Sequence, residues 1–310
     1  MKICVYGVSD KERPCFEEVR REMGLQVELH REDPSLASAH LAQGCTCVSI
    51  LSIPAPSALL DAWQAMGVRF LSTRTVGMDH IDLAHARAIG MAVDNITYAP
   101  QTVADYTIML ILMAMRQMKR VHQKFMRHDF SFAGVVGCGA IGSMLIRHLS
   151  GFGCRFLMYS RQEKEELRPY GSFVDLDTLL SGSDVVTLHL TLNAQTRHII
   201  GAPQLQRMKR DAILVNTARG GLIDTQALIQ ALRRQQIGGA ALDVLEQESG
   251  WYYHDCSAIP LAFPELEELE RFDNVILTPH LAWLSEEATA EMVYRSMESC
   301  RRFMNGGEIK

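Results

Sequence analysis

Short apolar runs alternate with helix-like stretches along most of this chain. In the first third, the apolar runs predict strands at residues 3–6, 46–50, 70–73 and 91–95. Helix-like stretches between them lie near 14–23, 57–66 and 82–89. This alternation of strands and helices is typical of an open α/β domain with a parallel sheet.

A second series of apolar runs follows residue 130. The strands that it predicts are 134–137, 155–160, 184–188, 212–216, 239–244 and 274–277. In both series the runs are continuous, without alternation of apolar and polar residues, as expected where helices cover both faces of a sheet. The predicted fold class is therefore α/β, with two doubly wound parallel-sheet domains.

The connections between the two series predict how the domains are joined. A long helical segment runs from residue 102 to about 127, apolar at first and then basic and amphipathic. Only 30 residues remain after His280, enough for one helix over about 285–303 but not for a domain. That helix must pack on a domain already built, so we expect a discontinuous first domain, 1–99 and 284–310. The second domain, 100–283, is inserted into it.

Composition and charge narrow the class of protein. Apolar residues make up 47% of the chain and charged residues 22%, as in a globular protein rather than a disordered or fibrous one. The net charge of −5 gives no reason to expect nucleic acid or an anionic membrane as a partner. The most apolar run, 106–115, is far shorter than the ~20 residues needed to cross a bilayer.

The N-terminus and the cysteines favour a reduced, cytoplasmic protein. The first apolar stretch is too short for a signal peptide. Eight cysteines at irregular spacing do not make a disulfide framework. Cys45 and Cys47 are the closest pair, but no histidine or second cysteine pair lies near them in the sequence, so we expect no zinc or other metal site.

A glycine-rich turn follows the strand at 134–137 and precedes a helix at 141–149: Gly137-Cys138-Gly139-Ala140-Ile141-Gly142. In this context the G-x-G-x-x-G spacing indicates a dinucleotide-binding Rossmann domain. Gly137 permits the tight turn, Gly139 lets the diphosphate approach the backbone, and Gly142 lets the helix pack on the strand. The helix N-terminus then favours the negative charge. The alternative is a structural turn that binds no ligand.

The end of the next strand distinguishes the two nicotinamide cofactors. In NAD-binding folds it carries an Asp or Glu that binds the ribose 2′-hydroxyl. Here the strand is followed by Ser160 and Arg161 and has no carboxylate at its end. A hydroxyl and a guanidinium suit a 2′-phosphate, so the sequence favours NADP(H), with NAD(H) as the alternative. Arg161 as a solvated surface residue is the competing interpretation.

Three polar segments, each following an apolar strand, carry candidate catalytic residues. They are 216–221 with Arg219, 243–248 with two glutamates, and 278–283 with His280. Ligands of parallel sheets bind at the carboxyl ends of the strands, so these side chains are expected to converge beside a nicotinamide. Taken singly, a salt bridge, a solvated acid and a buried core histidine are the alternatives.

Together these motifs resemble the D-2-hydroxyacid dehydrogenases over essentially the whole chain. The segments that carry the resemblance are 72–82 (STRTVGMDHID), 93–116, 238–246 (GGAALDVLE) and 251–256 (WYYHDC). Within the family the chain looks most similar to the D-lactate dehydrogenases of vancomycin-resistance clusters. The resemblance implies a flavodoxin-like substrate-binding domain, 1–99 and 284–310, an NAD(P)-binding domain, 100–283, and a homodimer.

The resemblance also implies catalytic and cofactor-binding roles. Arg219 binds and polarises a keto acid, His280 donates a proton, and Glu248 is the carboxylate partner of His280. Besides the three glycines of the turn and Arg161, the implied cofactor contacts are Ala140, Ile141, Ser160, Leu190, Thr191, Thr196, Thr217, Ala218 and Arg219.

Substrate positions follow in the same way. The backbone N–H groups of Val76 and Gly77 match a cradle for the substrate carboxylate. Tyr98 and Trp283 match positions that line the substrate pocket, and Asp243 matches an acid near the nicotinamide. Trp283 is bulky for such a position, so the preferred substrate side chain is left open.

The reaction implied is reduction of pyruvate or a related 2-keto acid to the D-hydroxy acid. A histidine suits proton donation because it titrates near neutral pH, and the planar fork of an arginine suits a carboxylate beside a keto oxygen. The alternatives are a glyoxylate or hydroxypyruvate reductase on the same scaffold and a non-catalytic nucleotide-sensing protein like the corepressors of this fold. Formate dehydrogenases of this fold carry an amide at the position of Glu248, which disfavours that activity.

One further feature departs from the family pattern. Residues 128–132 run almost directly into the first strand of the second series. The family usually has a connection there that is longer by roughly a dozen residues. In the family this region lies near the subunit interface, so the expected dimer depends on it.

Overall fold

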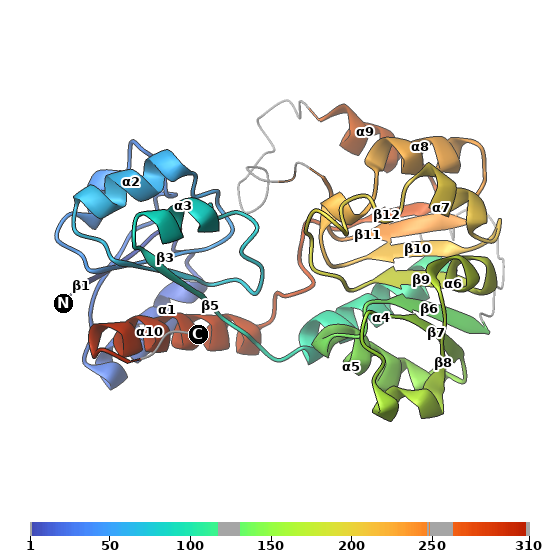
Figure 1. The fold of residues 1–310 in the computed structure, drawn as a ribbon, viewed down its shortest axis with the longest axis horizontal. Helices are drawn as coiled ribbons and strands as arrows, with labels where there is room; N and C mark the ends of the chain where they lie inside the picture. Colours follow the sequence, from blue (N-terminus) through green and yellow to red (C-terminus); the bar gives the residue numbers. More distant parts are fainter. Residues whose placement is uncertain (1, 117–130, 247, 249–262, 308–310) are drawn as a thin grey trace. The chain divides into compact units, whose positions relative to one another are not determined.

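The computed structural model describes residues 2–116, 131–246, 248 and 263–307. The chain forms two compact units, Met1–Ala99 with Leu284–Lys310, and Pro100–Trp283. Each unit is built on its own parallel sheet, with helices on both faces (Figure 1). The predicted fold class, two doubly wound parallel-sheet domains, is confirmed.

The first unit contains a five-stranded sheet in the order β2-β1-β3-β4-β5, which is the order of flavodoxin-like folds. Its strands are β1 (Lys2–Val5), β2 (Gln26–Leu29), β3 (Cys47–Ile50), β4 (Phe70–Thr73) and β5 (Ala92–Asn95). Helices α1 (Glu12–Met23) and α10 (Glu286–Met304) pack on one face of the sheet. Helices α2 (Ser57–Ala65), α3 (Leu83–Ala88) and the short η1 (Ala39–Ala42) pack on the other.

Helix α10 brings the end of the chain back to the first unit, beside α1 (Figure 1). Its buried residues Val293, Met297 and Cys300 join the apolar cluster that also contains residues of β1 and α1. The ring of Phe303 stacks on that of Phe70, with the centroids 4.8 Å apart. Burial of this apolar face stabilises the packing of α10 on the first unit, to which the chain returns at residue 284.

The sheet of the second unit has seven strands in the order β12-β11-β10-β9-β6-β7-β8. They are β6 (Phe132–Val136), β7 (Arg155–Tyr159), β8 (Gly171–Phe173), β9 (Val185–Leu188), β10 (Ile213–Asn216), β11 (Gly239–Leu242) and β12 (Val275–Leu277). The chain runs from β6 outward to β8, returns to β9 beside β6, and continues to β12. Ligands of such sheets bind at the carboxyl ends of the two strands where the order reverses, here β6 and β9.

Helices cover both faces of this second sheet as well. Helices α4 (Gln101–Met115) and α5 (Ala140–Leu149) lie on one face. Helices α6 (Leu176–Gly182), α7 (Ala202–Arg207), α8 (Thr225–Arg233) and α9 (Pro264–Arg271) lie on the other. Short 3-10 helices occur at η2 (Ser150–Phe152), η3 (Glu165–Tyr170) and η4 (Gly220–Leu222).

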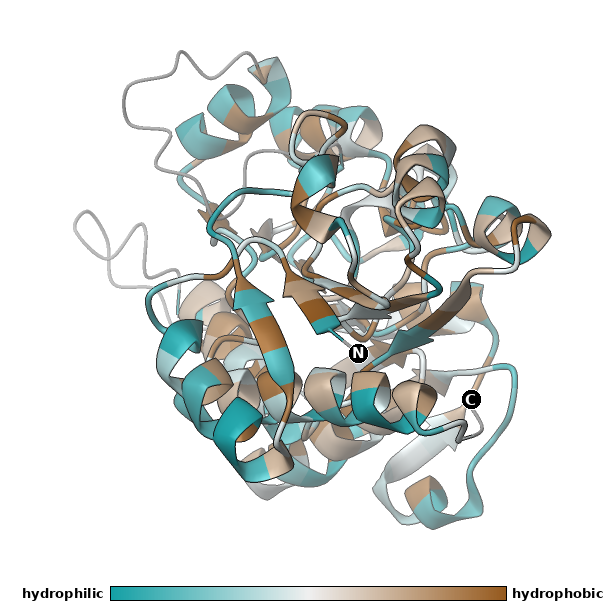
Figure 2. Ribbon diagram, turned by 90° about the vertical axis from the view of Figure 1, so that its left-hand side faces the viewer, coloured by the Kyte–Doolittle hydropathy of each residue, from teal (hydrophilic) through white to brown (hydrophobic). Residues whose placement is uncertain are grey.

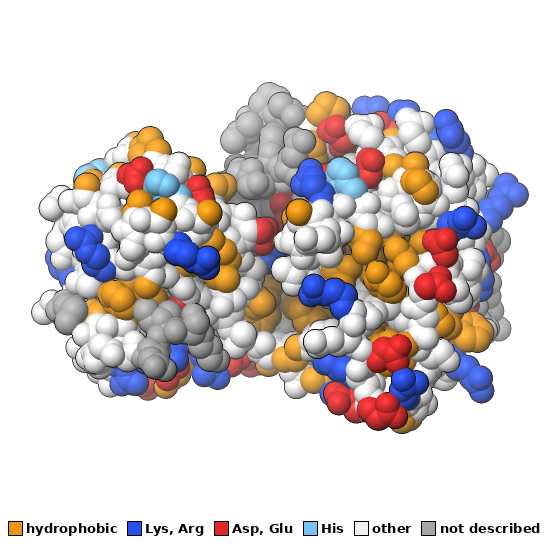
Figure 3. Space-filling model, viewed as in Figure 1, with side chains coloured by type: hydrophobic (Ala, Val, Ile, Leu, Met, Phe, Trp, Pro, Cys, Tyr) orange, Lys and Arg blue, Asp and Glu red, His pale blue; other side chains and the backbone are white. Residues whose placement is uncertain are grey.

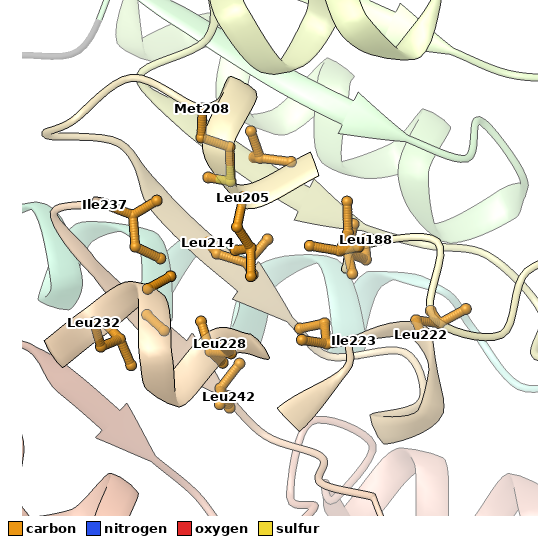
Figure 4. Packing of buried hydrophobic residues seen from close by; sticks show 14 of the residues in the cluster. Leu188, Leu205, Met208, Leu214, Leu222, Ile223, Leu228, Leu232, Ile237 and Leu242 are labelled. Carbon is orange, nitrogen blue, oxygen red and sulfur yellow. The ribbon is translucent and has the colours of Figure 1, made fainter. Parts of the chain in front are cut away.

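The largest apolar cluster of the second unit lies between its sheet and α7 and α8 (Figure 4). Leu188, Leu214 and Leu242 come from three neighbouring strands, and Leu228 and Leu232 meet them from α8. Burial of each such side chain contributes ~1.5–3 kcal/mol to folding. Along the helices in Figure 2, hydrophobic residues alternate with hydrophilic ones, as expected for helices with one face on a sheet.

Two strands escaped the sequence analysis, and both are at the edges of their sheets. Strand β2 has apolar residues only at Val27 and Leu29, and strand β8 is three residues long. An edge strand is less completely covered than a central strand, so it needs no continuous apolar run. The other predicted strands are present, with ends that differ by at most two residues.

The helix expected over 102–127 is present from Gln101 to Met115, and the rest of that prediction lies outside the described residues. The short connection expected at 128–132 also falls mostly outside them. None of the helices within the described ranges combines the length and apolar character needed to cross a membrane. Basic and acidic side chains are interspersed on the face shown in Figure 3.

Candidate active site

The glycine-rich turn joins β6 to α5, and each of its glycines meets a different constraint. Gly137 has a left-handed backbone with φ of +102°, and a Cβ there would lie 2.6 Å from the carbonyl oxygen of His189. A Cβ on Gly142 would lie 2.1 Å from the carbonyl oxygen of Gly137, so only glycine allows this close packing. Around Gly139, by contrast, no atom lies within 4 Å of an added Cβ. The turn therefore leaves open space at the N-terminus of α5, where a diphosphate fits.

Other candidate cofactor positions follow the neighbouring strands at the same edge of the sheet. Ser160 is half-buried and Arg161 is exposed, directly after β7. Leu190 and Thr191 follow β9, and the hydroxyl of Thr196 donates to the carbonyl oxygen of Thr191 at 2.7 Å. Because the strands are parallel, their carboxyl ends bring these residues to the edge of the sheet that carries the glycine-rich turn.

Arg219 lies in a tight loop that a buried asparagine closes. The Asn216 side chain donates to the carbonyl oxygen of Arg219 at 2.9 Å and accepts the N–H of Ala218 at 3.0 Å. The hydroxyls of Thr217 and Thr107 lie 2.8 Å apart and tie the loop to α4. Asn216 is fully buried, so its amide is committed to the loop. Asn216 belongs to the segment 216–221, but nothing in the sequence pattern predicts this role for it.

The loop of Arg219 packs against the loop that carries the two glutamates. A Cβ on Gly220 would lie 2.0 Å from the carbonyl carbon of Leu245 and 2.4 Å from the backbone nitrogen of Glu246. This contact leaves no room for any side chain at Gly220. The loops that follow β10 and β11 are therefore in direct contact within the second unit.

His280 and Glu248 form a hydrogen-bonded pair. The imidazole Nδ1 lies 2.8 Å from Oε1 of Glu248, and Oε2 of the same carboxylate accepts the N–H of Leu245 at 2.6 Å. The His280 side chain is 20% exposed and that of Glu248 18%, so the pair is partly shielded from water yet open to a small molecule. One oxygen of the carboxylate thus meets the ring and the other meets the backbone, which fixes the orientation of the imidazole.

A buried carboxylate, that of Asp243, holds the loop of His280. It accepts hydrogen bonds from the hydroxyl of Thr278 at 2.6 Å and from the N–H groups of Leu281 and Ala282 at 2.9 Å each. The N–H of His280 donates to the backbone carbonyl oxygen of Asp243 at 2.8 Å. His280 itself has a left-handed backbone with φ of +53°, which a non-glycine residue keeps only when its surroundings impose it.

Glu246, two residues before Glu248, serves a separate network. Its carboxylate lies 2.7 Å from Nε2 of His198 and 3.1 Å from Nη2 of Arg197. It also accepts from the N–H and hydroxyl of Thr225 at 3.3 and 3.2 Å. The structure thus distinguishes the two glutamates, since only Glu248 meets His280.

The residues expected to bind the substrate carboxylate lie in the first unit, directly after β4. Val76 is 43% exposed, and its carbonyl oxygen accepts from the side chain of Asn95 at 2.6 Å. The hydroxyl of Thr75 donates to the carbonyl oxygen of Gly77 at 2.6 Å. Arg74 comes just before this loop and is fully buried, paired with Glu12 at 3.0 Å.

The two candidate pocket residues belong to different units. Tyr98 is half-buried and follows β5 in the first unit, whose first stretch of chain ends at Ala99. Trp283 is half-buried and is the last residue of the second unit, close in sequence to His280.

Comparison with known proteins shows which family has this sequence. Residues 108–282 match the model of the "D-isomer specific 2-hydroxyacid dehydrogenase, NAD binding domain". The chain belongs to the D-isomer specific 2-hydroxyacid dehydrogenase family. This confirms the resemblance stated above, and with it an oxidoreductase carrying an NAD-binding Rossmann domain.

Relatives of this dehydrogenase extend over its full length. It is 40% identical to a D-specific alpha-keto acid dehydrogenase of Enterococcus faecium, covering 97% of this chain and 96% of the relative. It is 30% identical to a D-lactate dehydrogenase of Escherichia coli K12, over 99% of this chain and 98% of the relative.

A solved structure from the same family shows the same fold. It is a D-lactate dehydrogenase from Aquifex aeolicus complexed with NAD and lactic acid, with a TM-score of 0.89 and 27% identity. The alignment covers 98% of this chain and 96% of that one.

Two titratable groups lie at the glycine-rich turn of this dehydrogenase, the half-buried His189 and the buried Cys138. Burial lowers the pKa of His189, at the end of β9, to about 4, so its ring is neutral at physiological pH. Burial also raises the pKa of the Cys138 thiol to about 11, against the opposing effect of Lys164. The thiol inside the turn is therefore protonated and acts as a small apolar group.

Proposed function

We propose that this dehydrogenase reduces pyruvate or a closely related 2-keto acid to the D-2-hydroxy acid, with NADPH preferred over NADH. The observation that carries the proposal is the His280–Glu248 pair, 2.8 Å between Nδ1 and Oε1, in the unit that matches the family's NAD-binding domain. The relatives named above are D-specific keto acid and D-lactate dehydrogenases, which supports this substrate class.

The cofactor fits the open turn at Gly139, and when bound it supplies the hydride. The residues proposed to hold it are Gly137, Gly139, Ala140, Ile141, Gly142, Ser160, Arg161, Leu190, Thr191, Thr196, Thr217, Ala218 and Arg219. Asp243 is proposed to lie near the nicotinamide, beside the loop of His280 that it holds. The diphosphate gains the N–H groups and the dipole of α5.

His280 is proposed as the proton donor to the carbonyl oxygen of the substrate. Glu248 uses one oxygen for the ring and the other for the N–H of Leu245, an arrangement that suits an ionised carboxylate. An ionised Glu248 stabilises the imidazolium and fixes the ring, with Nδ1 toward the carboxylate and Nε2 on the opposite side. Nε2 is therefore the atom proposed to give up the proton.

Arg219 is proposed to bind the substrate carboxylate and the keto oxygen with its planar fork, stabilising the alkoxide that develops during reduction. The N–H groups of Val76 and Gly77 are proposed to hold the same carboxylate. Tyr98 and Trp283 are each proposed to contact the substrate, and the scan of keto acids described below measures which substrate side chain is preferred.

The preference for NADPH rests on the end of β7, where Ser160 and Arg161 stand in place of the acid that selects NAD.

A homodimer is proposed from the family resemblance. Light scattering after size-exclusion chromatography tests it, and a monomer mass at micromolar concentration would contradict it.

A scan of keto acids with NADH and NADPH tests the function. Pyruvate, 2-ketobutyrate, glyoxylate, hydroxypyruvate and phenylpyruvate are compared by kcat/KM, and the product of pyruvate is resolved by chiral chromatography. We expect the highest kcat/KM with pyruvate or 2-ketobutyrate, and D-lactate as the product. A preference of tenfold or more for glyoxylate or hydroxypyruvate would assign the alternative reductase activity. No turnover of any keto acid would favour the nucleotide-sensing alternative, and L-lactate would contradict the proposed stereochemistry.

A further inference from the structure

The segment that follows β7 contains three acidic residues, and each of them pairs with an arginine. Glu163 and Glu165 both pair with Arg168, at 2.6 and 2.8 Å. Glu166 pairs with Arg147 of α5 at 3.2 Å. The two arginines therefore offset two of the three negative charges near the position where an NAD-specific enzyme carries its ribose-binding carboxylate.

Two cations of the same segment, Arg161 and Lys164, have a different environment. Within the described ranges, neither forms an ion pair with a carboxylate. The ammonium of Lys164 instead donates to the hydroxyl of Ser143 at 3.0 Å, and that hydroxyl donates to the carbonyl oxygen of Cys138 at 3.0 Å. Ser143 is buried in the first turn of α5, so Lys164 is held beside the glycine-rich turn.

We infer that Lys164, held by Ser143, is a second cationic determinant for the 2′-phosphate of NADPH, beside Arg161. This inference rests on the proposed preference for NADPH. A 2′-phosphate carries close to two negative charges, and a lysine binds phosphate as a point charge where an arginine binds through its fork. Because Lys164 has a neutral partner, binding the phosphate breaks no ion pair.

Equilibrium binding of the oxidised cofactors tests this without a catalytic readout. Dissociation constants for NADP+ and NAD+ are measured by isothermal titration calorimetry on wild type, Lys164→Gln and Lys164→Arg. We expect Lys164→Gln to weaken NADP+ about tenfold, as the loss of one charge near a phosphate does, and to leave NAD+ unchanged. Lys164→Arg keeps the charge and is expected to keep most of the affinity for NADP+.

Lys209→Gln is the matched control. Lys209 is a lysine of the same unit that pairs with Asp184 at 2.7 Å, before the amino end of β9 and away from the turn. Its replacement is expected to change neither dissociation constant. Ser143→Ala removes the tether and keeps the charge, so it is expected to weaken NADP+ by a smaller factor than Lys164→Gln. It also tests the inference if Lys164→Gln does not fold.

The small ligands adenosine 2′,5′-bisphosphate and AMP locate the effect on the cofactor. Lys164→Gln is expected to weaken the bisphosphate and leave AMP unchanged. Equal weakening of NAD+ and NADP+ would assign Lys164 to the diphosphate that both cofactors share and would overturn the inference.

Failure of the proposed preference looks different from failure of this inference. Wild type that binds NAD+ as tightly as NADP+ contradicts the preference itself. Wild type that prefers NADP+, with the preference unchanged in Lys164→Gln and in Ser143→Ala, contradicts only the role of Lys164.

Discussion

Two glutamates of one loop hold two different histidines. Glu248 lies 2.8 Å from the ring of His280, and Glu246 lies 2.7 Å from the ring of His198. Both pairs place a carboxylate against an imidazole, but only Glu248 meets His280, the histidine of the loop after β12. The electrostatic role proposed for Glu248 therefore has a natural comparison within the same loop.

Replacing Glu248 with Gln keeps the shape and one hydrogen bond but removes the charge opposite the imidazolium. Reduction requires the imidazolium, so we expect kcat/KM for reduction to fall at neutral pH by about 10- to 100-fold. The alkaline limb of the reduction profile is expected to move to lower pH, because the protonated ring has lost its counter-charge. The acid limb for oxidation of the D-hydroxy acid moves the same way, so oxidation at neutral pH suffers less. Paired pH–rate profiles measure both.

Glu246→Gln is the control for that experiment. It makes the same change two residues away, in the network of Arg197 and His198, and we expect both limbs to keep their positions. A uniform loss of rate in Glu248→Gln with unmoved limbs would mean that Glu248 only orients the ring.

Asp243→Asn tests the loop that carries His280. The amide provides one oxygen in place of two and brings an N–H₂ group to the N–H of Leu281 or Ala282. We expect a loss of ~1–3 kcal/mol in the free energy of unfolding, because a buried hydrogen-bonding group loses its partner. We also expect kcat to fall at least tenfold, because the ring of His280 is displaced. Denaturant unfolding and steady-state kinetics measure the two, and lower stability with unchanged kcat would limit Asp243 to a structural role.

At the scale of the element, the three glycines of the turn between β6 and α5 meet three different requirements. Gly137 needs a left-handed backbone, Gly142 needs close packing, and Gly139 faces open space. The first two are requirements of the fold. For the third we propose a requirement of the bound cofactor, since no atom of the protein lies within 4 Å of a Cβ added there.

Alanine at these positions should separate folding from binding. Gly139 has φ of −69°, so Gly139→Ala is expected to change the free energy of unfolding by less than about 1 kcal/mol. Its methyl group enters the space of the diphosphate, so NAD+ and NADP+ should both bind at least tenfold more weakly, by roughly 1.4 kcal/mol or more. Thermal unfolding and calorimetric binding measure these effects.

Gly142→Ala is the comparison within the same element. Its Cβ would lie 2.1 Å from a backbone oxygen, so we expect a clear loss of stability, on the order of 1–3 kcal/mol. If Gly139→Ala bound both cofactors normally, the diphosphate would have to lie elsewhere.

At the scale of the whole molecule, His189 links stability to pH. Burial lowers its pKa from an ordinary value of 6.5 to about 4. The unfolded chain therefore binds more protons than the folded chain between these values. The contribution of the neutral ring to the free energy of unfolding is fully present above pH 6.5 and is lost as the pH falls toward 4.

We expect His189 to cost the molecule about 1–2 kcal/mol of stability between pH 7 and pH 5, allowing for the part of the residue that reaches solvent. His189→Gln keeps a polar partner for the hydroxyl of Thr187 and does not titrate. The free energy of unfolding of both proteins is measured with denaturant at pH 7.5, 6 and 5. The difference between the two proteins removes the contribution of the other titrating groups. A fall with pH as steep in His189→Gln as in wild type would contradict the assignment to His189.

The sequence by itself determined the class of fold and the chemistry of the site. Continuous apolar runs predict central parallel strands because helices cover both of their faces, and the glycine turn and Arg219 and His280 follow such strands. Strands β2 and β8 were missed because an edge strand is incompletely covered and its sequence need not be apolar throughout.

Only the tertiary structure decided which side chains act together. The family resemblance alone favoured Glu248 over Glu246, and the packing of the loops after β10, β11 and β12 is what places the carboxylate of Glu248 against His280. The closure of the Arg219 loop by Asn216 and the tether of Lys164 to Ser143 left no signal in the sequence pattern. A hydrogen bond depends on where two loops meet in space, whereas hydrophobic periodicity reports only which face of each element is buried.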